Sequence, residues 1–126
     1  MPESEQHLKA KNRIVIILTA LGWLIIQELP DPQITPLGFR SYQYDVHAKK
    51  NGVRLVVEVD GKVGHSSTYA LWKGKFRDAC SFINHKVFTV RIPTADIVGR
   101  KALSDEIIRE EIEWQVEQKY GQKITL

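Results

Sequence analysis

The sequence predicts a single α/β domain built on a mixed sheet that helices flank. Three observations predict this class: apolar residues recur at helical spacing in three segments, short β-branched runs lie between them, and an Asn-Gly pair joins two of these runs. The 126 residues fit one domain of ordinary size, and 43% hydrophobic with 26% charged residues is a globular composition. We therefore expect one domain over residues 1–126.

The first third of the chain predicts a helix, a strand and a loop. Ser4 is a suitable N-cap for a helix over 5–21, and Gly22 would end that helix. Residues 23–29 are β-branched and aromatic enough for a buried strand. Residues 30–38 contain three prolines and one glycine, which predicts a loop.

The central part predicts a β-hairpin with a defined register. Two strand-like runs, 42–48 and 53–60, flank an Asn-Gly pair at 51–52, the strongest short-range signal for a type I′ turn. With these as the two turn residues, the pairing places Asp45 directly opposite Glu58.

The second half predicts two helices around one strand. After a polar loop over 61–67, a helix over 68–84 is followed by a strand over 87–92, and Ser104 then caps a long helix that ends at Gly121. The apolar face expected of the first helix consists of Trp72, Phe76, Ala79 and Ile83. The stripe expected of the second consists of Ile108, Ile112, Val116 and Tyr120. The predicted order is therefore α-β-β-β-α-β-α.

Charge is distributed unevenly along the chain. Residues 1–103 hold 15 basic against 9 acidic side chains, whereas residues 104–126 hold 3 against 6. A basic body suits a polyanionic partner such as DNA. The single cysteine, Cys80, excludes a disulfide framework, and the apolar run over 14–26 is shorter than a membrane span. We expect a soluble, cytoplasmic protein with no membrane partner.

Three carboxylates and a lysine converge on one face of the predicted hairpin. Side chains alternate between the two faces of a strand, so Glu58 and Asp60 share the face of Asp45, and Lys62 follows in the same phase. Like charges placed opposite each other on a sheet are destabilising, and a divalent cation with oxygen ligands removes that cost. The sequence therefore predicts that Asp45, Glu58 and Asp60 bind Mg²⁺ or Mn²⁺.

This arrangement has a chemical and a plain structural interpretation. A bound metal would polarise a phosphodiester and activate water, with Lys62 orienting that water or stabilising developing charge. Alternatively, the acids are solvated residues on the open face of an antiparallel sheet, paired with Arg54 and Lys62.

The same residues resemble the signature of the PD-(D/E)xK nuclease superfamily. The matching residues are Asp45 and the run Glu58-Val59-Asp60-Gly61-Lys62, and the superfamily's α-β-β-β-α-β core has the order predicted above. The resemblance covers about residues 4–95. It implies a restriction-endonuclease-like core, to which the helix over about 104–121 is a C-terminal extension.

Two departures from the superfamily pattern leave one role open. Tyr44 takes the place of the usual proline, and Asp60 stands two residues after Glu58, where a lysine is expected. Either residues 60–62 form the motif and Glu58 is an additional acid, or Asp60 fills the lysine position and Lys62 is a helper.

The surrounding sequence is similar to one branch of the superfamily. Residues 56–61, His65, 77–78 and 90–92 resemble the very-short-patch-repair-like branch, and an archaeal-type Holliday-junction-resolvase-like branch is the other candidate. The resemblance also implies that Glu5, at the start of the first helix, joins the metal site. The plain alternative is that this acid complements the helix dipole.

Basic residues near the predicted site are candidates for contact with DNA phosphates. Lys73 and Arg77 are four residues apart on one helix face, with Lys75 beside them. His65 lies in the loop next to the site, and His7 lies in the first helix. The alternative for the helix residues is a solvated face.

These observations together predict a metal-dependent DNA endonuclease that requires Mg²⁺ or Mn²⁺. A compact chain without a separate recognition domain suits a structure-selective, Holliday-junction-resolvase-like enzyme, or a nicking, repair or mobile-element endonuclease. Cutting both strands requires two active sites, so we expect a homodimer. The alternative is a DNA-binding or assembly module on the same scaffold, without turnover.

Overall fold

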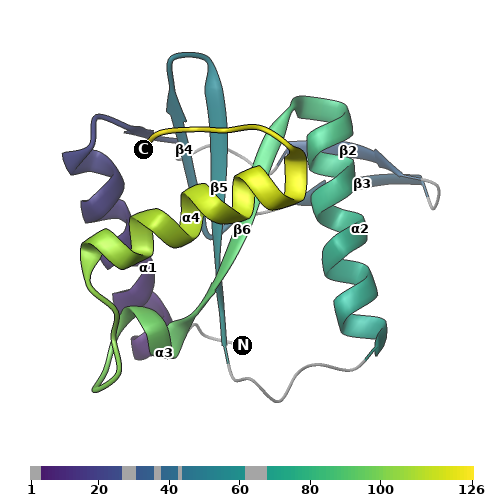
Figure 1. Cartoon of the computed structure of the whole chain (residues 1–126). Helices are drawn as coiled ribbons and strands as arrows, with labels where there is room; N and C mark the ends of the chain where they lie inside the picture. Colours follow the sequence, from purple (N-terminus) through teal and green to yellow (C-terminus); the bar gives the residue numbers. More distant parts are fainter. Residues whose placement is uncertain (1–3, 27–30, 36–37, 43, 62–67) are drawn as a thin grey trace.

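The chain forms a mixed α/β structure in which helices flank a four-stranded sheet (Figure 1). The computed structural model describes residues 4–26, 31–35, 38–42, 44–61 and 68–126, with the backbone path alone for 31–35, 38–42 and 68–73. The elements are α1 (Glu5–Ala20), β1 (Leu24–Ile25), β2 (Asp31–Thr35), β3 (Gly38–Tyr42), β4 (Val46–Lys50), β5 (Val53–Asp60), α2 (Thr68–His85), β6 (Val87–Pro93), α3 (Thr94–Ile97) and α4 (Asp105–Tyr120).

The sheet has the strand order β1-β4-β5-β6 and mixes both kinds of pairing. β4 is antiparallel to β1 and β5, whereas β5 and β6 are parallel, with α2 as the crossover between them. The predicted α/β class with a mixed sheet is therefore confirmed. A separate two-stranded sheet consists of β2 and β3.

The predicted register of the β4–β5 hairpin is confirmed. Val46 pairs with Val57 and Lys50 pairs with Val53, as the two-residue turn requires. Asn51 and Gly52 have φ angles of 51° and 79°, and positive φ at both positions defines a type I′ turn. Asp45 lies one residue before β4, so the same register places it beside Glu58.

The ends of the two long helices follow the sequence signals. The Ser4 hydroxyl accepts a hydrogen bond from the His7 amide at 3.1 Å, and the Ser104 hydroxyl accepts one from the Ile107 amide at 3.2 Å. Gly121 has a φ of 67° and ends α4 in the left-handed conformation that favours glycine.

The predictions for residues 23–48 are partly wrong. The first strand is short, since β1 covers only Leu24–Ile25 and Leu24 is 68% exposed; residues 27–30 are outside the described residues. The predicted loop over 30–38 contains strand β2, and the predicted strand over 42–48 is divided between β3 and β4. Proline usually indicates a loop, but both strands of a two-stranded sheet are edge strands, and an edge strand tolerates proline. This is why β2 was not predicted.

The predicted apolar face of α2 is also wrong. Ala79 is exposed and Ile83 is 73% exposed, whereas Asp78 and Ser81 are buried. The helix turns these polar residues toward the sheet because the sheet face beneath it is itself polar. The side chain of Trp72 lies outside the described part of the chain.

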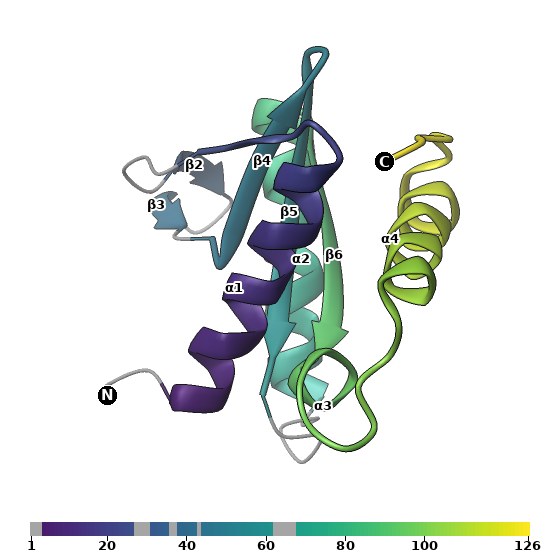
Figure 2. The ribbon, with the colours of Figure 1, turned by 90° about the vertical axis from the view of Figure 1, so that its left-hand side faces the viewer.

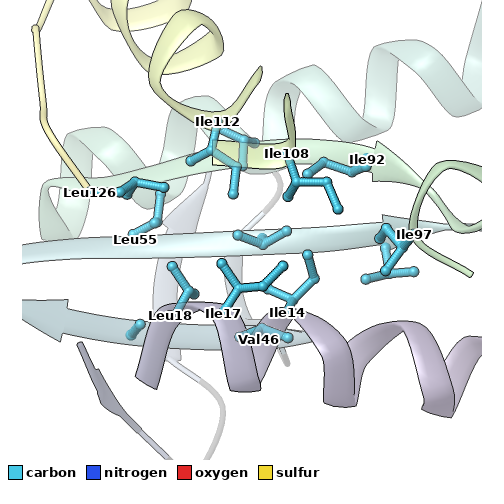
Figure 3. Close-up of a cluster of buried hydrophobic side chains, with 14 of the residues drawn as sticks. Ile14, Ile17, Leu18, Val46, Leu55, Ile92, Ile97, Ile108, Ile112 and Leu126 are labelled. Carbon is cyan, nitrogen blue, oxygen red and sulfur yellow. The ribbon is translucent and has the colours of Figure 1, made fainter. Parts of the chain in front are cut away.

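The hydrophobic core lies between α1, α4 and the opposite face of the sheet. Figure 3 shows side chains from α1 and α4 gathered around Leu55 of β5 and Ile92 of β6. The apolar stripe predicted for the last helix is confirmed, because three of its residues are fully buried: Ile108, Ile112 and Val116. Figure 2 shows α1 and α2 on opposite sides of the sheet.

Helix α4 also closes the outer edge of β6. The Gln115 side chain accepts a hydrogen bond from the Arg91 amide at 3.0 Å and donates one to the Arg91 carbonyl at 2.9 Å. The Tyr120 hydroxyl likewise accepts a hydrogen bond from the Thr89 amide at 3.0 Å. These side chains satisfy backbone groups that an open strand edge would leave for another chain.

Replacing Gln115 by Ala is expected to lower the free energy of unfolding by about 1–2 kcal/mol, because two backbone groups at the β6 edge lose their partners. Urea denaturation followed by circular dichroism measures this change. Gln118→Ala, on the exposed side of the same helix, is the matched control and should change stability by less than about 0.5 kcal/mol. Equal stabilities for the two variants would contradict the edge-closing role.

No helix in the described ranges combines the length and the apolar composition needed to span a bilayer.

Candidate functional site

Asp45 and Glu58 form a linked pair of carboxylates at the end of the β4–β5 hairpin that is opposite to its turn. The Asp45 amide donates a hydrogen bond to Glu58 Oε2 at 3.0 Å, and Asp45 Oδ2 accepts one from the Val59 amide at 2.8 Å. Each carboxylate is therefore held by the backbone next to the other. The predicted proximity of these two acids is confirmed.

The ring of His7 lies close to two oxygen atoms, one from Asp45 itself and one from the backbone of Val59. His7 Nε2 lies 3.0 Å from the Val59 carbonyl oxygen and 3.5 Å from Asp45 Oδ2. Because a carbonyl oxygen can only accept, Nε2 carries the proton that is donated to it. Helix α1 thus places the Nε2 donor of His7 next to the Val59 carbonyl and the Asp45 carboxylate.

Glu58 is buried, and its environment is unusual for a carboxylate. Only 5% of the residue is exposed, and burial raises the pKa of Glu58 to about 7. The positive charge of Arg77 acts to lower this pKa, and the negative charge of Asp45 acts to raise it. Arg77 Nη2 lies 3.2 Å from Glu58 Oε1, and that oxygen has no hydrogen-bond partner among the described residues.

This burial excludes the solvated interpretation for Glu58. A carboxyl with a strongly perturbed pKa beside a second carboxylate is typical of functional sites.

Asp60 faces a different partner from the other two acids. Its Oδ1 lies 3.5 Å from Arg91 Nη1, and its side chain is 50% exposed. Arg91 also binds the buried Asp78, through Nη2 at 2.8 Å and Nε at 3.2 Å. Lys119 of α4 forms a second ion pair with Asp78.

The pKa of the Arg91 guanidinium reflects these contacts. Burial acts to lower it, but the hydrogen bond to Asp78 and the charges of Asp78 and Asp60 raise it above its ordinary value. Arg91 therefore stays a cation that links the proposed site to α2 and, through Asp78, to α4.

The polar side of α2 supplies the partners that sequence reasoning missed. Gly74 lies under the Arg91 guanidinium, where an added Cβ would be 3.5 Å from Nη2. Four residues further, Asp78 binds that guanidinium, and the Ser81 hydroxyl lies 2.9 Å from the Tyr44 hydroxyl. The spacing 74, 77, 78 and 81 is a helical stripe of small and polar residues, and that signal was present in the sequence.

The other predicted site residues have separate outcomes. Glu5 is exposed and pairs with Lys9 at 3.1 Å, one turn along α1, so it is not brought to the carboxylate pair. Lys75 is exposed, whereas Arg77 is turned inward to Glu58. Lys62, His65 and the side chain of Lys73 lie outside the described residues.

Within the ranges that the structure describes, no group of three or more His, Cys, Asp or Glu side chains is placed to hold a metal ion. Of the three predicted ligands, Asp45 and Glu58 therefore lie together, whereas Asp60 forms an ion pair with Arg91.

Comparison with known proteins does not show a family for this chain. No family model matches the sequence, and the search of curated proteins finds no match. Among solved structures, the chain is similar to an XisH family protein from Nostoc punctiforme, at 14% identity and a TM-score of 0.44, over 83% of this chain and 92% of that one. A likeness at this level carries no argument about fold or function, so the proposals rest on the geometry of the chain itself.

Proposed function

We propose that this chain is a metal-dependent DNA endonuclease that hydrolyses phosphodiester bonds with Mg²⁺ or Mn²⁺. The observation that carries the proposal is the buried Glu58 carboxyl held against Asp45, with one oxygen that has no hydrogen-bond partner among the described residues. A buried carboxyl whose Oε1 has the ion pair with Arg77 but no hydrogen bond is costly, and its position beside a second acid favours a functional role.

The residues of the pair fit a hard divalent cation. Carboxylate and backbone carbonyl oxygens are the ligands that such cations prefer, and Asp45, Glu58 and the Val59 carbonyl supply them here. Asp45 and Glu58 would hold the metal, and Asp60 would join them only after release from Arg91. When bound, the metal would polarise a phosphodiester and lower the pKa of a coordinated water.

The chain's own side chains would prepare this site for an anionic substrate. Arg77 places a guanidinium 3.2 Å from Glu58, and Arg91 places another beside Asp60. His7 holds a donor against the Val59 carbonyl. These cationic and hydrogen-donating groups suit a phosphate that approaches the carboxylates. The roles proposed for Lys62, His65 and Lys73 remain predictions.

A homodimer also remains a proposal. Trp114 is 58% exposed and Ile107 is 49% exposed, seven residues apart on the outer side of α4. A second copy would cover these two apolar side chains, and a nuclease that cuts both strands of a duplex needs two active sites. Light scattering coupled to size-exclusion chromatography measures this oligomeric state.

A second candidate function is a DNA-binding or assembly module without turnover. The ion pairs favour it, because Glu58 and Asp60 already have the Arg77 and Arg91 cations as partners. A module of this kind would bind DNA in a salt-dependent manner and be indifferent to Mg²⁺.

A cleavage assay separates the two functions. Supercoiled plasmid, linear duplex, single-stranded DNA and a four-way junction are incubated with the protein in Mg²⁺, Mn²⁺ or EDTA. Cutting in either metal and none in EDTA is the expected result, and the preferred substrate identifies the class of endonuclease. Tight binding without cutting under every condition would contradict the nuclease proposal and support the binding module.

A further inference from the structure

One end of the sheet has a strong excess of positive charge. Residues 21–26, 46–57 and 79–90 contain no Asp or Glu. The cations in these segments are Lys49, Lys50, Arg54 and Lys86, and His47 and His85 accompany them. The three segments belong to β1, the β4–β5 hairpin and the stretch from α2 into β6, which are neighbours in the fold.

Strand pairing brings Lys49, Arg54 and Lys86 close together near the β4–β5 turn, and Lys50 lies next to them on the other face of β4. Lys49 pairs with Arg54 across the hairpin, and Arg54 pairs with Val87, the residue after Lys86. Paired residues on antiparallel strands have Cα atoms about 5 Å apart. Figures 1 and 2 both show the turn at the outer end of the sheet, where the hairpin projects beyond β1 and β6. We call Lys49, Lys50, Arg54 and Lys86 the basic end.

The contacts described for Lys50 and Lys86 are with groups that carry no negative charge. Lys50 donates a hydrogen bond to the Leu21 carbonyl at 2.7 Å, and the Lys86 ammonium lies 5.4 Å from the centre of the Phe82 ring. Arg54 donates a hydrogen bond to His47 Nε2 at 3.1 Å. None of the ion pairs recorded for the described residues includes Lys49, Lys50 or Lys86.

We propose that the basic end binds the phosphate backbone of duplex DNA. Like charges that are paired across a sheet destabilise it, and a bound anion removes the repulsion. The turn residues Asn51 and Gly52 have no apolar side chain, although the exposed Leu24 pairs with Lys49 beside them, so the test below includes a membrane surface. This inference rests on the proposed function for the choice of DNA, although it does not depend on cleavage.

The spacing along β5 relates the basic end to the carboxylate pair. Arg54 and Glu58 are on the same face of this strand, four residues apart, which is about 13 Å at the usual rise of a strand. The rise of a DNA duplex is about 3.4 Å per nucleotide, so this distance corresponds to about four nucleotides. The basic end would therefore contact phosphates about four nucleotides from the bond at the carboxylates.

The test compares two double variants that each remove two exposed positive charges. Lys49→Gln with Lys86→Gln changes the basic end, and Arg100→Gln with Lys101→Gln changes the exposed loop before α4. Binding of a fluorescein-labelled duplex of about 30 base pairs is measured by anisotropy in EDTA, so that no cleavage occurs, from about 50 to 200 mM salt.

The basic-end variant should bind at least about tenfold more weakly at about 0.1 M salt, and the slope of log K against log salt should decrease by about 2. The control variant should match the wild type in both quantities. Equal loss in the two variants, or no loss in either, would overturn the inference. Binding of anionic phospholipid vesicles but not of DNA would also overturn it.

Failure of this inference and failure of the nuclease proposal give different results. If the basic-end variant loses DNA binding while the wild type never cuts DNA, the basic end is confirmed and the nuclease proposal is wrong. If the wild type cuts DNA and the basic-end variant binds and cuts equally well, the nuclease is supported and the inference about the basic end is wrong.

Discussion

Replacing Asp45 by Asn, or Glu58 by Gln, is expected to reduce Mg²⁺-dependent DNA cleavage more than about 100-fold, since changes to residues that only support a metal ligand already cost about 10- to 100-fold. Both substitutions remove a negative charge and keep the shape of the side chain. In the Asp45→Asn variant the new amide oxygen can still accept from the Val59 amide, and in Glu58→Gln it can still accept from the Asp45 amide. The hydrogen bonds that hold the pair are therefore retained while metal affinity is lost.

The measurement is the rate of plasmid nicking under single-turnover conditions, together with thermal melting. Glu110→Gln, which changes an exposed acid on α4, is the matched control and should cut DNA at the wild-type rate. Retained folding with lost cleavage supports the catalytic role of the pair. Cleavage within about threefold of wild type in both site variants would contradict that role, and loss of folding in both would indicate a structural one.

The hairpin and the helix ends could be predicted from the sequence because each has a strong local cause. Asn51 and Gly52 determine a two-residue turn, and the turn determines the pairing of every residue in β4 and β5. Ser4, Ser104 and Gly121 determine where helices begin or end through hydrogen bonds within one turn. The proximity of Asp45 and Glu58 follows from this local register.

The arrangement around α2 could not be predicted in the same way. Residues spaced as Phe76, Ala79 and Ile83 indicate an apolar inner face, but which face turns inward depends on what the sheet presents. Here the sheet presents Glu58 and Arg91, so α2 turns Arg77 and Asp78 toward it. The polar stripe of α2 is visible in the sequence, but the ion pairs that it makes with residues far apart in sequence depend on tertiary packing.

The contact of Asp60 also depends on tertiary packing. Strand alternation correctly places it on the face of Glu58, yet its partner in the structure is Arg91 on the neighbouring parallel strand. The alternation identifies the face, whereas the charge on the next strand determines which way the side chain turns.

The stability of the protein is expected to fall as the pH rises through the folded-state pKa of Glu58. Burial raises this pKa from 4.5 to about 7, so between these values the folded protein binds a proton that the unfolded chain has released. Stability is therefore greatest below pH 4.5 with respect to this group and declines until the pH exceeds 7. The full decline is about 3 kcal/mol, at about 1.36 kcal/mol for each pH unit.

Urea denaturation at pH 5, 6, 7 and 8 measures this decline, and Glu58→Gln provides the comparison. The neutral amide does not titrate, so the variant should lose less stability than the wild type over this range. Arg77→Met is the second comparison: it removes the cation that lowers the pKa of Glu58, so the decline should extend to higher pH. Equal pH profiles for wild type and Glu58→Gln would show that Glu58 is ionised in both states.

The same experiment tests metal binding without any need for catalysis. A divalent cation at the carboxylate pair favours the ionised form of Glu58, so Mg²⁺ should restore stability to the wild type at pH 8, by about 2.7 kcal/mol at 100 times its dissociation constant. At pH 5, where Glu58 is protonated in the folded protein, the gain should be smaller. Glu58→Gln should gain little at either pH. An equal gain in wild type and variant would mean that Mg²⁺ binds elsewhere and that Glu58 is not a ligand.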